Sequence, residues 1–125
     1  MMFKPQHEFL LLDKYKEKFT ITDRTIFAYD GVIYTNSILP SHLVEHESCH
    51  FKQQKKYGLD NWVKSYLEDD KFRLKMEIQA YKVQLRSVKD RNQRNFIRMK
   101  CAEDLSSSLY GNLLNYDEAF KIINC

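Results

Sequence analysis

The spacing of apolar residues changes along this chain of 125 residues, and each change marks an expected element of secondary structure. Between Gln6 and Phe19 apolar side chains recur every three or four positions, which indicates a short amphipathic helix. Residues 25–29 and 32–35 are instead rich in β-branched and aromatic types, and Asp30-Gly31 between them is a two-residue type I′ turn signal. This pattern predicts a β-hairpin.

The remainder of the chain has helical periodicity. Ser41 is a suitable N-cap for a helix over residues 42–57, and Gly58 is suited to end it. Further helices are expected over residues 60–67, 71–90, 96–109 and 116–123, with an acidic helix end at 68–70, a loop at 91–95 and a break at 111–112. The expected fold is therefore α+β, with a small N-terminal β-hairpin or sheet followed by a mostly helical body.

Composition and charge narrow the class of protein. A hydrophobic content of 43% argues against a disordered chain, and the length allows a single domain over residues 1–125. The 20 basic and 17 acidic residues nearly balance, so the overall charge does not favour nucleic acid as a partner. The basic segment 89–100 is interpreted as a solvated loop and helix start. A small helical nucleic-acid-binding protein that uses this segment remains the least favoured alternative.

Residues 46–50 carry the candidate chemistry, because they form the pattern His-Glu-x-x-His. His46 and His50 are four residues apart, so on a helix both imidazoles share one face and can reach one zinc ion at roughly 2.0–2.1 Å. Glu47 is rotated around the helix and is expected beside the coordination position that a catalytic zinc leaves open for water. We interpret Glu47 as the general base.

A catalytic zinc normally takes three protein ligands, so a third one is needed. Glu77 is the candidate, because it lies next to the buried stripe of the helix expected over residues 71–90. The alternative is that Glu77 pairs with Arg73, which is one turn earlier on the same helix. The acidic residues 68–70 are rival carboxylates, which we interpret as a solvated helix end.

A specific order of residues surrounds these candidates: His-Glu-x-x-His at 46–50, then Gln54, Gly58, Trp62, Tyr66, Arg73, Glu77, Ala80 and Tyr81. This order resembles the small phage-type zinc metallopeptidases of the gluzincin class. The similarity continues through residues 105–111 and 118–119 and is weakest before Thr20. The resemblance implies a minimal zincin-like domain with the metal on two helices, and His46, His50 and Glu77 as the ligands of Zn²⁺.

Other residues near the motif have open roles. Tyr81 and Tyr110 are candidates for the phenol that hydrogen-bonds a developing oxyanion, although eight tyrosines leave this choice open. His42 is not expected to be a ligand, because three successive histidines along one helix diverge too far for one tetrahedral ion. Cys49 is interpreted as a small core residue. Residues 53–54, both glutamine, either steady the histidines through hydrogen bonds or face water.

The function that these residues predict is hydrolysis of peptide bonds in a peptide or protein substrate. Glu47 would take a proton from water and pass it to the leaving amine. The alternative is a non-catalytic structural or interaction protein stapled by zinc, but such a site has no use for a base beside an open position. If the protein comes from a phage, virion components are a further class of partner.

The early apolar run at residues 9–12 is far shorter than a signal-peptide core or a membrane span, so no membrane association is expected. Three cysteines without C-x-x-C spacing predict free thiols in a reducing compartment. The expected location is therefore the cytoplasm, that of the host for a phage protein, with the virion as the other location.

The predicted hairpin ends only a few residues before the metal helix, so we expect it to border the active-site cleft. An open strand edge there would bind an extended peptide as an additional strand. The alternative is that both edges are covered, for example by the segment before Phe19.

Overall fold

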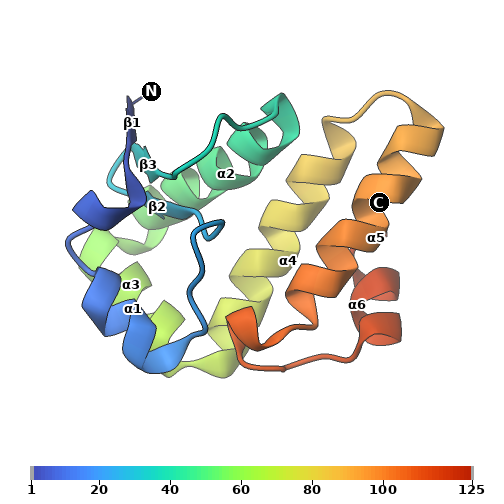
Figure 1. Ribbon diagram of the computed structural model, residues 1–125. Helices are drawn as coiled ribbons and strands as arrows, with labels where there is room; N and C mark the ends of the chain where they lie inside the picture. Colours follow the sequence, from blue (N-terminus) through green and yellow to red (C-terminus); the bar gives the residue numbers. More distant parts are fainter. Residues whose placement is uncertain (1, 125) are drawn as a thin grey trace.

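The structure is a computed structural model that describes residues 2–124, with a small sheet at the start of the chain and a mostly helical body after it (Figure 1). In chain order the elements are β1 (Met2–Lys4), the 3-10 helix η1 (Gln6–Glu8), α1 (Leu12–Lys18), β2 (Phe27–Tyr29), β3 (Val32–Tyr34), α2 (Ser41–Tyr57), α3 (Leu59–Glu68), α4 (Asp70–Arg86), α5 (Arg91–Leu105), the 3-10 helix η2 (Ser108–Tyr110) and α6 (Tyr116–Ile122). The predicted α+β class is confirmed.

The sheet has the strand order β1-β3-β2, with β1 parallel and β2 antiparallel to β3. β2 and β3 form the predicted hairpin, in which Tyr29 is paired with Val32. Asp30 and Gly31 have φ values of 50° and 80°, as a type I′ turn requires at both central positions. β1 was not predicted, because its three residues are all exposed and show no alternation of buried and exposed side chains.

The prediction of one helix between Gln6 and Phe19 is wrong in extent, because the chain forms η1, a bend and then the shorter α1. The Gln6 side chain donates to the carbonyl oxygens of Thr22 and Thr25 at 2.8 and 2.7 Å, which fixes the start of this segment. The bend leaves Leu10 83% exposed and turns Phe9 into an aromatic core. Tertiary contacts therefore override the local helical period here.

Helix boundaries differ from the prediction where an acidic side chain caps the next helix. Asp69 accepts hydrogen bonds from the backbone of Lys71 and Phe72, so it starts α4 rather than only ending α3. Asp90 caps α5 in the same way, and residues 91–95 are therefore helical rather than the expected loop. The helix predicted to run to residue 90 ends at Arg86.

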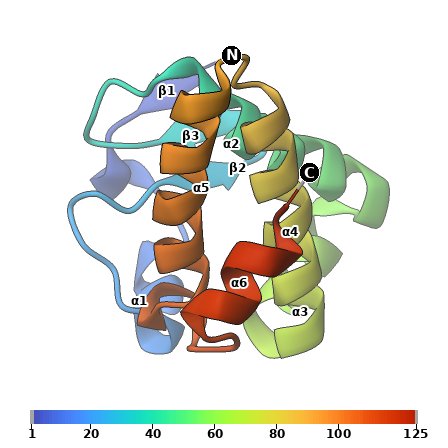
Figure 2. The same cartoon turned by 90° about the vertical axis from the view of Figure 1, so that its right-hand side faces the viewer.

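The expected helix over residues 96–109 ends at Leu105, where Ser106 and Ser107 lead into η2. Gly111 follows η2 with φ 93°, which agrees with the predicted break. α6 packs against α5 (Figure 2). Ser41 is the first residue of α2 and makes no side-chain cap, so the predicted N-cap at Ser41 is wrong. Gly58 ends α2 as predicted, with φ 88°, and α3 begins at Leu59, one residue before the start expected at residue 60.

The buried hydrophobic side chains form two clusters. The first is mainly aromatic and joins Phe9, Tyr15, Phe27 and Tyr66 to α3 and α4. The second joins α4, α5 and α6 through residues such as Leu105. α2 packs against α4, α3 and β2, so the residues of the predicted motif lie at the junction of the sheet and the helical body (Figure 1).

Two of the three cysteines lie within the described residues. Cys49 and Cys101 are free, which agrees with the expected thiols, and Cys125 lies outside the described residues. Within residues 2–124 no helix combines the length and the apolar character needed to cross a membrane.

Candidate metal centre

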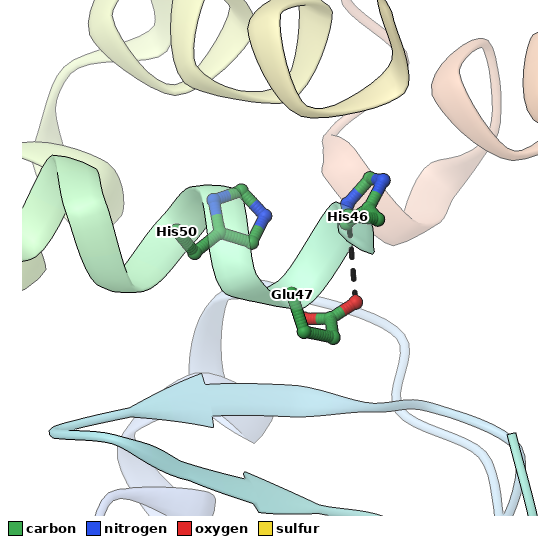
Figure 3. A group of neighbouring side chains, drawn as sticks. All are labelled: His46, Glu47 and His50. Atoms are coloured by element: carbon green, nitrogen blue, oxygen red, sulfur yellow. Dashed lines mark ion pairs between the residues drawn. The ribbon is translucent and has the colours of Figure 1, made fainter. Parts of the chain in front are cut away.

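The three predicted ligands meet between two helices. His46 and His50 lie on α2 and point toward α4 (Figure 3), where the Glu77 carboxylate lies between their rings. Glu77 Oε1 is 3.2 Å from His46 Nε2, and Glu77 Oε2 is 3.1 Å from His50 Nε2. All three side chains are buried, with at most 5% of each residue exposed.

Gln53 fixes the ring of His50. Its Oε1 is 2.8 Å from His50 Nδ1, and it also accepts a hydrogen bond from Trp62 Nε1 at 3.3 Å. Its Nε2 donates to the carbonyl oxygen of Met76 at 3.1 Å, so the orientation of the amide is determined from both ends. His50 Nδ1 must therefore carry a proton, which it donates to Gln53. Nε2 is the ring nitrogen that faces the Glu77 carboxylate.

Gln84 has the corresponding position beside His46, with Oε1 3.0 Å from His46 Nδ1. This residue was missed in the sequence, although Glu77 and Gln84 are seven residues apart and so share one face of α4. Buried polar residues spaced by three, four or seven from a candidate ligand are the signal that would have found it. Each histidine is thus held by one neutral amide.

The ionisation of this cluster follows from its burial and its close contacts. Burial lowers the pKa of His50, but the Glu77 charge and hydrogen bond outweigh it and raise that pKa to about 9. Burial raises the pKa of Glu77, but the two histidines outweigh it and hold that pKa well below its usual range. A carboxylate that faces two Nε2 atoms needs positive charge between them, which either a proton or a metal cation supplies.

Two imidazole nitrogens and one carboxylate form a donor set that suits zinc, so the chemistry of these residues fits the ion that the sequence predicts. The ligand atoms of His46, Glu47 and His50 also lie within 4.8 Å of one another and could hold a metal ion. Of the two carboxylates, Glu77 is closer to the imidazoles, because Glu47 Oε2 is 3.9 Å from His46 Nε2. By distance, Glu77 is therefore the better candidate for the third ligand.

Glu47 projects from the other side of α2, toward the sheet (Figure 3). It is 6% exposed, and its Oε2 is 3.9 Å from His46 Nε2, which is beyond hydrogen-bond distance. Burial raises the pKa of Glu47 above its ordinary value, and the neighbouring imidazoles offset part of this effect. A carboxylate with a raised pKa is a stronger base than a solvated one, which agrees with the predicted role.

Tyrosines surround the other side of Glu77. Tyr66 OH donates to Glu77 Oε2 at 2.7 Å and so helps to hold the carboxylate. Tyr81 and Tyr110, the predicted oxyanion candidates, lie together with their hydroxyl oxygens 2.9 Å apart, and the Tyr81 ring packs on His46. Burial, followed by the charge of Glu77, raises the pKa of both well above the usual value, so they remain neutral phenols.

The alternative pairing of Glu77 with Arg73 is not formed. Arg73 is 1% exposed and donates to the carbonyl oxygens of Tyr66 and Tyr110 at 2.7 and 3.2 Å, and it forms an ion pair with Asp70. Arg73 therefore anchors η2 and α3 to α4 and leaves the Glu77 carboxylate to the histidines.

Three further residues near the motif have defined places. Gln54 bonds the hairpin at Ala28 O (2.7 Å) and Asp30 N (3.1 Å), so it does not steady the histidines. Cys49 is half-buried and lies 3.6 Å from the Gln53 amide. His42 is half-buried and contacts Gln84 rather than the ligand cluster.

A cavity of about 370 Å³ opens onto this cluster, and its lining includes Glu47, Glu77 and both ligand histidines. β2 contributes Phe27 and Ala28 to the lining, and α5 contributes residues such as Ile97 and Cys101. β2 is an edge strand of the sheet. Gln54 occupies the outward carbonyl of Ala28, and the N–H of Ala28 points to the same side of an antiparallel strand and has no partner in the described part of the chain.

Comparisons with protein-family models, curated proteins and solved structures find no match for this chain. The functional conclusion therefore rests on the residues of the site themselves.

Proposed function

We propose that this protein is a zinc-dependent peptidase of the gluzincin type. The observation that carries the proposal is the convergence of His46, His50 and Glu77 in a buried cluster, with Glu47 beside it on the wall of the same cavity. When bound, the zinc ion would supply a Lewis acid that polarises a carbonyl group and activates water. His46 and His50 would bind it through Nε2, and Glu77 through its carboxylate.

The chain's own residues supply the proton transfer and the geometry. Glu47 would accept a proton from a water molecule at its carboxylate and later deliver it to the leaving amine nitrogen. Gln53 and Gln84 keep the ligand histidines in the tautomer that leaves Nε2 free, and Tyr66 holds Glu77 in place. These hydrogen bonds hold the three proposed ligands in fixed positions, which supports a metal site.

Tyr81 and Tyr110 remain the candidates for stabilising an oxyanion. Both line the cavity and both stay protonated, so either phenol can donate a hydrogen bond toward a carbonyl oxygen that gains charge. The hydrogen bond between the Tyr81 and Tyr110 hydroxyl groups would have to break if the hydroxyl that donates it donates to a substrate instead.

The strand edge in the cavity lining supports an extended peptide or protein substrate. The N–H of Ala28 is available at the edge of β2, and Phe27 beside it gives the wall an apolar part. A peptide that pairs with this edge would cross the cluster with its backbone already oriented. The edge remains only partly open, because Gln54 covers the carbonyl of Ala28.

The alternative of a zinc-stapled structural protein gives no role to Glu47, which lies beside the cluster and lines the same cavity. The alternative of nucleic-acid binding by residues 89–100 is weakened by two of their arginines. Arg94 donates to Val88 O at 2.9 Å and Arg98 to Phe120 O at 2.9 Å, so both serve the packing of α5.

The free thiols of Cys49 and Cys101 support a cytoplasmic location, that of the host cell if a phage encodes the protein, with virion components as further partners.

The experiment that tests the function compares wild type with Glu47→Gln after zinc loading. The amide cannot accept the proton of water, so we expect hydrolysis of a quenched fluorogenic peptide library to fall at least about 100-fold while zinc content and folding stay unchanged. Equal activity of the two proteins would refute Glu47 as the base. An inactive wild type that binds zinc would favour the structural alternative.

A further inference from the structure

A buried side-chain amide joins a proposed zinc ligand to a second histidine. Gln84 is 2% exposed, and its Oε1 is 3.0 Å from His46 Nδ1. Its Nε2 is 2.9 Å from the Nδ1 of His42, which lies one turn before His46 on α2 and lines the cavity. The orientation of this amide therefore determines which nitrogen of each ring carries a proton.

The direction of the two hydrogen bonds follows from the proposed metal site. If His46 binds zinc through Nε2, its proton must be on Nδ1, and that N–H needs an acceptor, which is Gln84 Oε1. The other end of the amide is an NH₂ group, which can only donate, so His42 Nδ1 must accept. A neutral imidazole that accepts at Nδ1 has its proton on Nε2.

The Nε2–H of His42 is then a donor without a partner among residues 2–124. Burial, followed by the charge of His46, lowers the pKa of His42 below its ordinary value. In the part of the cavity lining that β2 supplies, the Ala28 N–H also has no partner among the described residues. Both groups are suited to carbonyl oxygens, which an extended peptide presents along its backbone.

We propose that His42 binds the substrate, by donating a hydrogen bond from Nε2 to a backbone carbonyl oxygen of a peptide in this cavity. The inference rests on the proposed peptidase function and extends it to a binding residue on the metal helix. Gln84 is the positioning residue, since it orients His42 and His46 together. The substrate class is a peptide in extended conformation rather than a small molecule without a peptide backbone.

The first test is the tautomer of His42 in the zinc-loaded protein, measured by long-range ¹H–¹⁵N NMR. We expect the proton on Nε2, with the exposed His7 as an internal reference for a solvated ring. A proton on Nδ1 alone would overturn the proposal, because His42 would then present an acceptor to the cavity. This measurement does not depend on activity.

The second test compares three zinc-loaded variants on the best peptide from a quenched fluorogenic library. His42→Met removes the donor and should raise KM about tenfold with kcat within about twofold, because the hydrogen bond is made equally in the bound substrate and in the transition state. His42→Gln keeps an N–H at the corresponding position and should restore most of the loss. His7→Met is the matched control and should behave as wild type.

The outcomes separate the two proposals. Unchanged KM in His42→Met, in a wild type that does hydrolyse peptides, overturns the role of His42 and leaves the peptidase function intact. Zinc-loaded wild type that cleaves no peptide of the library overturns the peptidase function, and the substrate role of His42 with it. Loss of zinc from His42→Met also counts against the inference, because it would place His42 in the metal site.

Discussion

Zinc affinity should depend on pH through one identifiable proton. In the metal-free protein, His50 faces the Glu77 carboxylate at 3.1 Å, and this contact raises the pKa of His50 to about 9 in spite of its burial. Gln53 already accepts the proton on Nδ1, so the additional proton is on Nε2, the atom that zinc would bind. Zinc and this proton therefore compete for one atom.

The magnitude follows from the pKa. At pH 7 a group with a pKa of about 9 is about 99% protonated, so each zinc ion should displace about one proton from His50. The affinity should then rise about tenfold from pH 7 to pH 8 and level off above pH 9, because Glu77 is ionised throughout this range. Competition with a chelator of known pH dependence measures the affinity, and titration calorimetry in two buffers counts the protons.

Glu77→Gln is the control variant for the pH dependence of zinc affinity. The amide carries no charge, so it no longer raises the pKa of His50, and burial lowers that pKa instead. The variant should bind zinc more weakly and release less than half a proton per ion at pH 7. Wild-type affinity that is flat between pH 7 and pH 9 would show that no proton on His50 Nε2 competes with zinc in this range, and would refute this reasoning.

Three further predictions concern single side chains. Glu47→Gln should retain zinc and the fold but lose hydrolysis, as elemental analysis and the peptide assay would show, and survival of activity would exclude it as the base. Glu77→Ala should lose zinc while the matched Glu68→Ala keeps it, and equal zinc content in dialysed samples of both would mean that the wrong carboxylate was chosen. Gln53→Ala should weaken zinc binding by about 10- to 100-fold, whereas Gln54→Ala should lower only the free energy of unfolding, by about 1 kcal/mol, in denaturant titrations.

The helix with the motif could be predicted from the sequence because its signals are local. The spacing of His46 and His50 and the glycine at 58 act within one or two turns. The Asp30-Gly31 turn is equally local, since two neighbouring positive φ values determine the hairpin. These features needed no knowledge of distant contacts.

Glu77 was harder, because helical periodicity placed it near a buried face but could not show what it would meet. Its choice over residues 68–70 depended on context and resemblance, and the ring contacts at 3.1 and 3.2 Å now support it geometrically. Gln84 was missed because a glutamine has no charge and no metal preference, so only the packing of α2 on α4 reveals its function. The same packing separated Gln53, which contacts His50, from Gln54, which contacts the hairpin.

The incorrect element boundaries have two physical causes, namely contacts with distant residues and ambiguous capping signals. The Gln6 side chain and the burial of Phe9 bend a segment whose period is helical, and both depend on residues more than ten positions away. β1 exists because β3 supplies its hydrogen-bond partners, which a three-residue segment cannot indicate alone. At Asp69 and Asp90 the capping signal was present, but an acidic residue between two helical patterns suits the end of one helix and the start of the next.

The most direct test of the central claim is an anomalous difference map from crystals of the zinc-loaded protein, recorded on both sides of the zinc absorption edge. We expect one peak per chain, within about 2.3 Å of His46 Nε2, His50 Nε2 and a Glu77 carboxylate oxygen, with Glu47 outside the coordination sphere. No peak between α2 and α4, or a peak bound by Glu47 in place of Glu77, would contradict it.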